Sequence, residues 1–241
     1  MCVLEGPDLV EAALESGVEF EAVYVDAAAG ASLQRLIQKA DDLGVRVFAL
    51  AEGVLEKVAD AQTPQPVLAA VRFEQRRVDS IPKSGLTLVL HDLRDPGNVG
   101  TIIRSADAAG ATAVVLTGQS VDPFNPKTLR ASAGSIFHLP VVVASIDDTL
   151  DYFGDAQLLA TVVRGGKNHR EVNFNVATVV VIGNEADGLD DETIARCGKS
   201  ISIPMDGRSE SLNAGVAASL IAFEALWQRR DAAGTPPPRS L

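Results

Sequence analysis

The sequence has few cysteines and no long apolar run. Only two of its 241 residues, Cys2 and Cys197, are cysteines, so neither a zinc cluster nor a disulfide scaffold is expected, and a cytoplasmic location is favoured. The longest apolar stretch, 212–227, contains Glu224 and is shorter than the roughly 18 residues of a membrane helix. Acids also stand where a secretory signal would carry bases. We therefore expect no metal ion and no membrane partner.

Net positive charge is lacking as well. The chain carries 32 acidic and 21 basic residues, a formal net charge of −11, which argues against a protein that simply coats nucleic acid. The charge is uneven, however. Residues 1–71 hold 12 acids and 4 bases, whereas residues 72–104 hold 4 acids and 6 bases. A basic stretch thus lies between two acidic blocks.

Two familiar nucleotide-binding signatures are absent. No G-x-G-x-x-G follows a predicted strand, and no G-x-x-x-x-G-K-[ST] occurs, so neither a standard dinucleotide-binding enzyme nor a P-loop enzyme is expected. The remaining composition, with 46% hydrophobic and 22% charged residues, is that of an ordinary globular protein. The length suits one large domain or two small ones.

Helix and strand signals alternate along the chain in two series. The first series occupies residues 1–73 and predicts a small α/β domain, with helices over 7–16, 32–43 and 53–59 and strands over 19–25, 45–50 and 67–73. Residues 74–85 are polar and basic and are interrupted by Pro82 and Gly85. This composition indicates a linker between domains.

The second series, residues 86–230, predicts a larger α/β domain. Its strands are short apolar runs, as expected for parallel strands covered on both faces: 86–90, 113–116, 141–144, 158–163, 178–182 and 200–203. Helices are predicted over 99–109, 126–133 and 147–153. A long last helix carries one apolar stripe, formed by Val216, Leu220, Phe223 and Trp227. The tail, 231–241, is expected to be loose.

Polar residues cluster where three of these strands end, which is the usual place for ligands in an open α/β sheet. In the first segment, 91–104, a Pro-Gly turn places Asn98 at a helix N-cap, with Arg104 six residues on. In the second, Gly183 allows close backbone approach and Glu185 follows in a loop. The third, 201–213, leads straight into the last helix. Taken singly, each segment is equally typical of a helix cap or a solvated turn.

Together the three segments resemble the three motifs of the SpoU (TrmH) family of RNA 2′-O-ribose methyltransferases, in the SPOUT superfamily. The matching stretches are DPGNVGTIIRSADAAGA (95–111), VVVIGNEADGL (179–189) and IPMDGRSESLNAGVAASL (203–220). The resemblance covers about residues 86–230. More weakly, the first domain resembles the small ribosomal-protein-like RNA-binding domain that precedes the catalytic domain in many members.

This resemblance implies a SPOUT fold, a parallel sheet with a deep C-terminal trefoil knot, in which S-adenosylmethionine is held largely by backbone groups. The positions that match the family's cofactor contacts are Gly183, Ile203 and Leu212. Family members act as homodimers in which the residue matching Arg104 is contributed across the interface. The last helix is a plausible contributor to such an interface, and packing inside the monomer is the alternative role for its stripe.

The resemblance also implies the catalytic residues. Arg104 would activate the ribose hydroxyl or orient the neighbouring phosphate, and Asn98 would orient Arg104 and the RNA. Because a guanidinium holds its proton tightly, we favour phosphate binding and electrostatic activation over proton abstraction. The remaining members of this set would line the same pocket and fix the hydroxyl or the cofactor: Glu185, Ser211 and Asn213.

RNA contacts are expected from basic residues near the predicted site, with ordinary surface charge as the alternative. These residues are Arg72 and Arg76 beside the linker, and Arg164, Lys167 and Arg170 in a loop after a strand. His91 and His138 fit a structural role better than a catalytic one. Relatives often carry a basic arm before the segment matching 3–6, whereas this chain begins almost at that segment. With an acidic first domain, we expect weak, salt-sensitive RNA binding.

Ribosomal RNA, most of all 23S rRNA, is the favoured substrate, because the two-domain layout is commoner among ribosomal-RNA and antibiotic-resistance members of the family. A transfer-RNA methyltransferase is the nearest alternative. A non-catalytic RNA-binding or ribosome-assembly factor on the same fold is another, although the intact set of motif residues argues against a decayed active site.

The substitution Arg104→Ala tests the assigned role. Turnover should be abolished while S-adenosylmethionine binding stays nearly unchanged, because the arginine is assigned to the RNA and not to the cofactor. Calorimetric titration with the cofactor and a methyl-transfer assay separate the two effects. Loss of cofactor binding in this variant would overturn the assignment.

Overall fold

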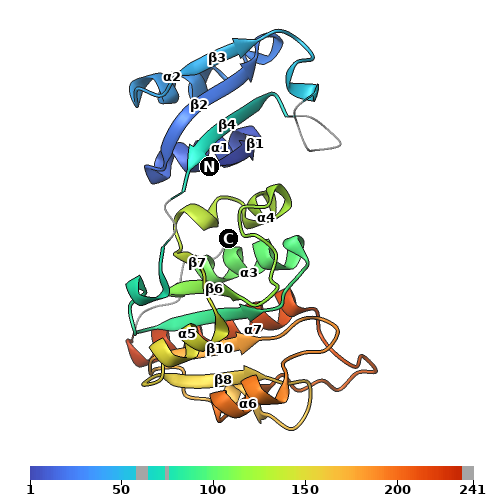
Figure 1. Cartoon of the computed structure of the whole chain (residues 1–241). Coiled ribbons are helices and arrows are strands. Elements are labelled where there is room, and N and C mark those ends of the chain that lie inside the picture. The colour runs from blue at the N-terminus through green and yellow to red at the C-terminus, as the bar shows by residue number, and fades with distance from the viewer. Residues whose placement is uncertain (58–64, 74–75, 235–241) are drawn as a thin grey trace.

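Two α/β parts follow one another along the chain and stack end to end (Figure 1). The computed structural model describes residues 1–57, 65–73 and 76–234. The smaller part is formed by the N-terminal residues, and the larger part holds the long parallel sheet and the C-terminal helix. Parts of the predicted linker (74–75), tail (235–241) and third helix (58–59) lie outside the described residues.

The smaller part is a four-stranded mixed sheet with the order β1-β4-β2-β3. Strands β1 and β2 pair antiparallel with β4, and β2 pairs parallel with β3. The bounds are Cys2–Glu5 for β1, Glu19–Asp26 for β2, Val47–Leu50 for β3 and Val67–Arg72 for β4. Sequence reasoning missed β1, because its four residues form a strand only through distant pairing with β4.

Two α-helices accompany this sheet, α1 (Pro7–Ser16) and α2 (Gln34–Asp42). The predicted bounds of α1 are confirmed, because proline fixes its start and Gly17 ends it in the left-handed conformation with φ 75°. Three short 3₁₀ turns lie in the N-terminal half of the chain: Ala27–Ala29, Leu55–Lys57 and Val78–Ser80.

The larger part contains a seven-stranded sheet with the order β7-β6-β5-β10-β8-β11-β9, and every neighbouring pair is parallel. The bounds are Leu86–His91 for β5, Ala113–Thr117 for β6, Val141–Val143 for β7, Gln157–Thr161 for β8, Lys167–Asn168 for β9, Thr178–Ile182 for β10 and Ser200–Ser202 for β11. The predicted parallel sheet is therefore confirmed. The trefoil knot that the resemblance implies stays a prediction.

Helices cover both faces of this sheet, so its strands β5, β6 and β10 are buried along their whole length. On one face α3 (Pro96–Ala108) packs on β6 and α7 (Ala214–Ala232) packs on β5, while α4 (Pro126–Ser132) packs on α3. On the other face lie α5 (Ile146–Tyr152) and α6 (Asp191–Cys197). Two further 3₁₀ turns cover Ser135–Phe137 and His169–Glu171.

Helix α3 begins earlier than predicted, so the assignment of Asn98 as its N-cap is wrong. Pro96 occupies the first turn, and the cap is Asp95, whose side chain accepts a hydrogen bond from the Asn98 N–H at 2.7 Å. Proline has no N–H to satisfy and its φ suits the first helical position. Asn98 therefore lies inside the first turn, and its side-chain amide is available for other partners.

Three of the four residues of the predicted α7 stripe are on its outer face, so the alternative that the whole stripe packs in the monomer core is wrong. Val216, Leu220 and Trp227 are 48%, 41% and 55% exposed. The buried face consists mainly of small residues: Ala214, Gly215, Ala218, Ile221, Ala222 and Ala225. Small side chains allow α7 to lie close to α3, and this excludes the larger residues from the contact.

The predicted linker, 74–85, and the predicted tail, 231–241, each include residues that the structure packs into the larger part. In the predicted linker, Ile81 is only 2% exposed and packs with residues of α5, and its carbonyl accepts a hydrogen bond from the Tyr152 hydroxyl at 2.7 Å. Helix α7 runs through Ala232, two residues into the predicted tail. Arg229 and Arg230 in its last turn favour this extension, because basic side chains stabilise a helix C-terminus.

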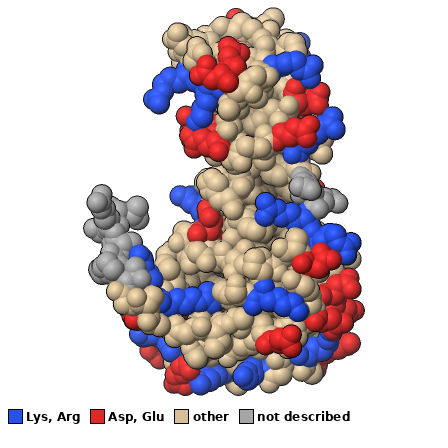
Figure 2. Space-filling view, turned by 90° about the vertical axis from the view of Figure 1, so that its left-hand side faces the viewer, with Lys and Arg blue, Asp and Glu red and all other residues tan. Residues whose placement is uncertain are grey.

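The two parts touch through α4 and the turn that follows it. Arg130 Nη1 lies 3.2 Å from Glu5 Oε2, and the Glu5 side chain is buried. Gly134 has φ 88°, and a Cβ there would lie 2.8 Å from the Cβ of Ala12. Acidic and basic side chains are interspersed over both parts on the face shown in Figure 2. None of the helices within residues 1–57, 65–73 and 76–234 has the length and hydropathy of a membrane span.

Gly100 sets how closely α3 and α4 approach. A Cβ at this position would lie 2.5 Å from the Ala131 Cβ and 2.7 Å from the Thr128 carbonyl oxygen. We expect Gly100→Ala to lower the free energy of unfolding by about 1–3 kcal/mol, since the packed helices must move apart. Urea titration measures this. The control is Gly154→Ala, whose nearest added contact is an ordinary 3.4 Å, and equal effects of both variants would contradict the account.

Candidate active site

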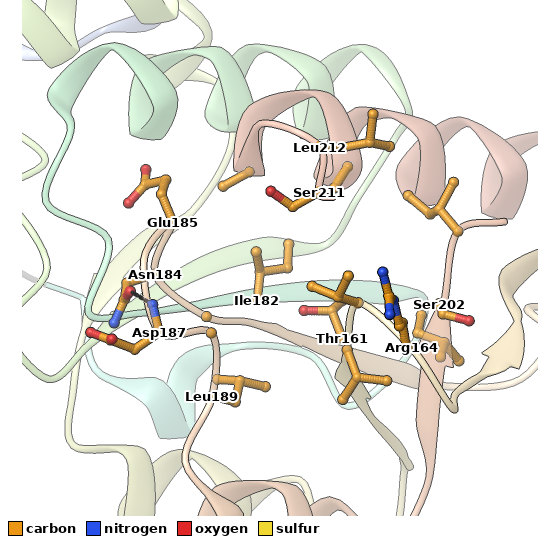
Figure 3. A pocket seen from close by; sticks show the side chains of 18 of the residues that line it. Thr161, Arg164, Ile182, Asn184, Glu185, Asp187, Leu189, Ser202, Ser211 and Leu212 are labelled. Atoms are coloured by element: carbon orange, nitrogen blue, oxygen red, sulfur yellow. Dashed lines mark hydrogen bonds between the residues drawn. The ribbon is translucent and has the colours of Figure 1, made fainter. Parts of the chain in front are cut away.

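Four loops meet at the carboxyl edge of the large sheet. They follow β5, β8, β10 and β11, and because all four strands are parallel their ends lie along one edge. Three of these loops, together with the start of α7, enclose a pocket of about 670 Å³ (Figure 3). This volume is typical of a small-molecule or cofactor site.

Apolar side chains and backbone form most of the pocket wall. The three positions predicted to contact the cofactor, Gly183, Ile203 and Leu212, all line it. Further apolar lining comes from strand ends and from α6 and α7: Ile182, Leu189, Ile194, Ile201, Met205, Ala217 and Ile221. The charged residues that line it are Arg164, Glu185, Asp187 and Glu210.

The loop after β10 folds back on itself at Gly183. A Cβ there would lie 2.3 Å from both the carbon and the oxygen of the Gly188 carbonyl, so only glycine fits. The Asn184 side chain holds the turn, because its Oδ1 accepts hydrogen bonds from the N–H groups of Ala186 and Asp187 at 2.9 and 2.7 Å. Glu185 is thereby presented at the edge of the pocket (Figure 3).

Asn98 joins the three sequence segments. Its Nδ2 donates a hydrogen bond to Glu185 Oε1 at 2.6 Å, and its Oδ1 accepts one from Asn213 Nδ2 at 2.9 Å. Asn213 is the N-cap of α7, and its own Oδ1 accepts from the Val216 N–H at 3.2 Å. Asn98 and Asn213 therefore fix the Glu185 carboxylate from outside the pocket. Ser211 lies next to them and lines the pocket.

Arg104 does not line the pocket of its own chain. Six residues of helix separate it from Asn98, about 9 Å along the axis of α3. Its side chain is exposed. The next residue, Ser105, shares a 2.7 Å hydrogen bond with Ser219 of α7. Arg104 is thus an exposed residue of α3 that directly precedes a contact between α3 and α7.

The other predicted basic residues fall in two places. Arg72 and Arg76 line a groove of about 520 Å³ between the two parts of the chain. Three phenylalanines line the same groove: Phe73 stacks on Phe137 with ring centroids 5.5 Å apart, and its ring is tilted against Phe124 at 4.6 Å. Arg72 also contacts Glu21 at 3.1 Å. Lys167 and Arg170 lie in and after β9, and Arg170 is 3.9 Å from Glu224.

His91 and His138 make structural contacts. Buried His91 pairs its Nδ1 with the Thr117 hydroxyl at 2.9 Å, and its Nε2 lies 4.0 Å from the carboxylate of Asp190. Hydrogen bonds from Thr193 at the start of α6 lower the pKa of Asp190. His138 Nδ1 lies 3.6 Å from Asp107. Within the described residues no group of three or more His, Cys, Asp or Glu side chains is arranged to hold a metal ion.

Sequence reasoning missed part of the pocket. Thr161, Val162 and Val163 line it, as do Asn184 and Asp187. The strand-end rule that picked Glu185 applies equally to the end of β8, where Thr161 stands, and would have found this wall. The apolar lining residues carry no comparable signal, because nothing in a buried run distinguishes a pocket wall from a core.

Comparison with known proteins identifies this architecture. The profile described as the SpoU rRNA Methylase family matches residues 85–223, which is more than half of the chain. The chain belongs to this family. A second profile, described as RNA 2′-O ribose methyltransferase substrate binding, matches residues 3–76. The first match covers most of the larger part of the fold, and the second covers the smaller part.

Several SpoU relatives span nearly the whole chain. This chain is 32% identical over 224 residues to the 23S rRNA (guanosine(2553)-2′-O)-methyltransferase RlmP of Bacillus subtilis, and the match covers 92% of this chain and 86% of the relative. An AdoMet-bound rRNA methyltransferase from Sinorhizobium meliloti superposes with a TM-score of 0.83 at 30% identity, covering 96% of this chain and 87% of that one. AviRb of Streptomyces viridochromogenes, in complex with AdoMet, gives 0.81 at 29% identity, covering 94% and 89%.

S-adenosylmethionine is the cofactor of these SpoU methylases, and the pocket fits its chemistry. The molecule combines a flat adenine ring and a polar ribose with a charged amino-acid part. Apolar side chains such as Leu189, Ile201 and Leu212 form a wall suited to the faces of the adenine ring, and the glycine-bounded turn at Gly183 exposes backbone groups for hydrogen bonding. Charged side chains at the pocket edge suit the amino-acid part.

Gly183→Ala tests whether this turn shapes the cofactor pocket. The added methyl group would collide with backbone atoms, so the turn must move, and we expect S-adenosylmethionine affinity to fall at least about tenfold. Isothermal titration calorimetry measures this, with a thermal melt to verify folding. The matched control is Gly207→Ala, where no atom lies within 4 Å of an added Cβ. Unchanged affinity in a folded Gly183→Ala variant would refute the assignment.

Proposed function

We propose that this chain transfers the methyl group of S-adenosylmethionine to a ribose 2′-hydroxyl in RNA, with 23S rRNA as the substrate. The observation that carries the proposal is the Asn213–Asn98–Glu185 hydrogen-bond chain at the edge of a cofactor-sized pocket. It joins all three motif segments at one place. The names of the relatives RlmP and AviRb, and the substrate-binding match over 3–76, support a ribosomal RNA substrate.

The cofactor supplies an electrophilic methyl group on a positively charged sulfur. The reaction forms a bond from ribose O2′ to this methyl carbon, breaks the carbon–sulfur bond and releases the hydroxyl proton. A ribose hydroxyl is a weak nucleophile, so the protein must position it and favour loss of its proton. Glu185 and Ser211 at the pocket edge provide acceptor and donor groups for positioning, and Asn98 keeps the carboxylate in place.

Arg104 is assigned to the RNA. Its guanidinium would bind the phosphate beside the target ribose and stabilise the developing negative charge on O2′. Because Arg104 is exposed and lies outside its own pocket, a second copy of the chain could bring this arginine to the neighbouring pocket. This supports a homodimer with shared active sites.

Arg72, Arg76, Lys167 and Arg170 are proposed as further RNA contacts. Arg76 is exposed beside the phenylalanine-lined groove between the two parts. Aromatic side chains stack on unpaired bases and arginines bind the adjoining phosphates, which is the usual way of recognising single-stranded RNA. The chain's net charge of −11 repels the RNA phosphates, and only these few basic side chains counteract that repulsion.

The test is methyl transfer from radiolabelled S-adenosylmethionine to separated 23S rRNA and tRNA, with Arg104→Ala as the inactive control. We expect label in 23S rRNA and none with the variant. Label in tRNA alone would replace the proposed substrate by the alternative. Cofactor binding without label in free RNA or in ribosomal particles would favour a non-catalytic RNA-binding factor.

The exposed face of α7 provides the test of the dimer. We expect sedimentation at micromolar concentration to give a dimer, and Leu220→Glu to give a monomer, because a charge at the centre of an apolar interface is left unpaired. Asp231→Lys, at the end of the same helix, is the charge-changing control. A stable monomer for the unsubstituted protein would contradict the dimer.

A further inference from the structure

Arg164 is the basic residue of its loop that faces the cofactor pocket. It lines the cofactor pocket, whereas Lys167 and Arg170 do not. Figure 3 shows its side chain at the opposite side of the pocket from Glu185 and Asp187, near Thr161 and Ser202. Among the described residues that line the pocket, it is the one basic residue.

The backbone that carries Arg164 is held against the sheet. The Val162 N–H donates to the Ile201 carbonyl at 2.9 Å, and the Ser202 hydroxyl donates to the Gly166 carbonyl at 3.0 Å. Gly166 packs so closely on β11 that an added Cβ would lie 2.5 Å from the Ile201 carbonyl carbon. Arg164 therefore extends from a positioned loop on the pocket wall.

The guanidinium of Arg164 has no partner among the described residues. It takes part in none of the ion pairs or hydrogen bonds found there, whereas Arg130, Arg170, Arg196 and Arg229, half of the other arginines described in the larger part, do. Three carboxylates line the rest of the pocket: Glu185, Asp187 and Glu210. An anionic ligand group entering this pocket would be repelled by these acids and attracted only by Arg164.

We propose that Arg164 binds the carboxylate of the cofactor's amino-acid part. A carboxylate leaving water requires a compensating charge, and a guanidinium can give it two parallel hydrogen bonds. This assignment rests on the proposed function, and it moves Arg164 from the predicted RNA contacts to the cofactor. With this role, Arg164 would give the pocket a higher affinity for ligands that carry the carboxylate than for analogues without the carboxylate.

The test is a cycle of two proteins and two ligands, measured by isothermal titration calorimetry. The ligands are S-adenosylhomocysteine and its decarboxylated analogue S-adenosyl-3-thiopropylamine, which differ only in the carboxylate. We expect Arg164→Ala to weaken binding of the first about tenfold and of the second less than about twofold. Arg164→Lys should recover part of the loss, because a single charge remains. Lys199→Ala, an exposed position outside the pocket, should leave both affinities unchanged.

Two results would overturn the inference in distinguishable ways. Equal effects of Arg164→Ala on both ligands would show that the arginine does not contact the carboxylate, while the proposed function stands. Failure of the unsubstituted protein to bind S-adenosylhomocysteine at all would overturn the proposed function and this inference together. If, in the first case, Arg164→Ala also lowers RNA affinity, the residue is an RNA contact as the sequence predicted.

Discussion

The two hydrogen bonds of the Asn98 side chain unite the site. One joins α3 to the loop after β10 through Glu185, and the other joins α3 to the start of α7 through Asn213. The first and last of these segments are separated by more than a hundred residues in sequence, and each by itself has a polar side chain that ordinary capping would explain. An amide is suited to this position because it donates and accepts at once, so a carboxylate and a second amide are both satisfied.

Close backbone approach makes these bonds attainable. Gly100 allows α3 to rest on α4, Gly183 allows its loop to fold on itself, and Gly166 allows the neighbouring loop to press against β11. The parallel sheet supplies the common edge, and the glycines bring the loops on that edge within hydrogen-bond range. The small residues on the buried face of α7 act in the same way toward α3. They leave Val216, Leu220 and Trp227 exposed on the outer face of α7.

Sequence reasoning was most accurate where local chemistry alone decides the structure. The apolar run 178–182 is β10 to the residue, and Pro7 and Gly17 delimit α1. It failed where distant contacts decide. Strand β1 depends on pairing with β4, and the α7 stripe, for which core packing was the alternative to an interface role, faces outward because α3 accepts only small side chains. The cap of α3 is a local error, since Asp95 takes it in place of Asn98 with Pro96 at the first helical position. Motif resemblance identified Gly183, Ile203 and Leu212 as pocket residues, but not the wall after β8 that holds Arg164.

The central claim is that this site methylates a ribose hydroxyl and not a base. Mass spectrometry of nucleosides, released by complete digestion of 23S rRNA after incubation with the protein and S-adenosylmethionine, tests it most directly. The account predicts one new nucleoside that carries its methyl group on the sugar, identified by fragmentation into a methylated ribose and an unmodified base. A methyl group retained on the base fragment would contradict it.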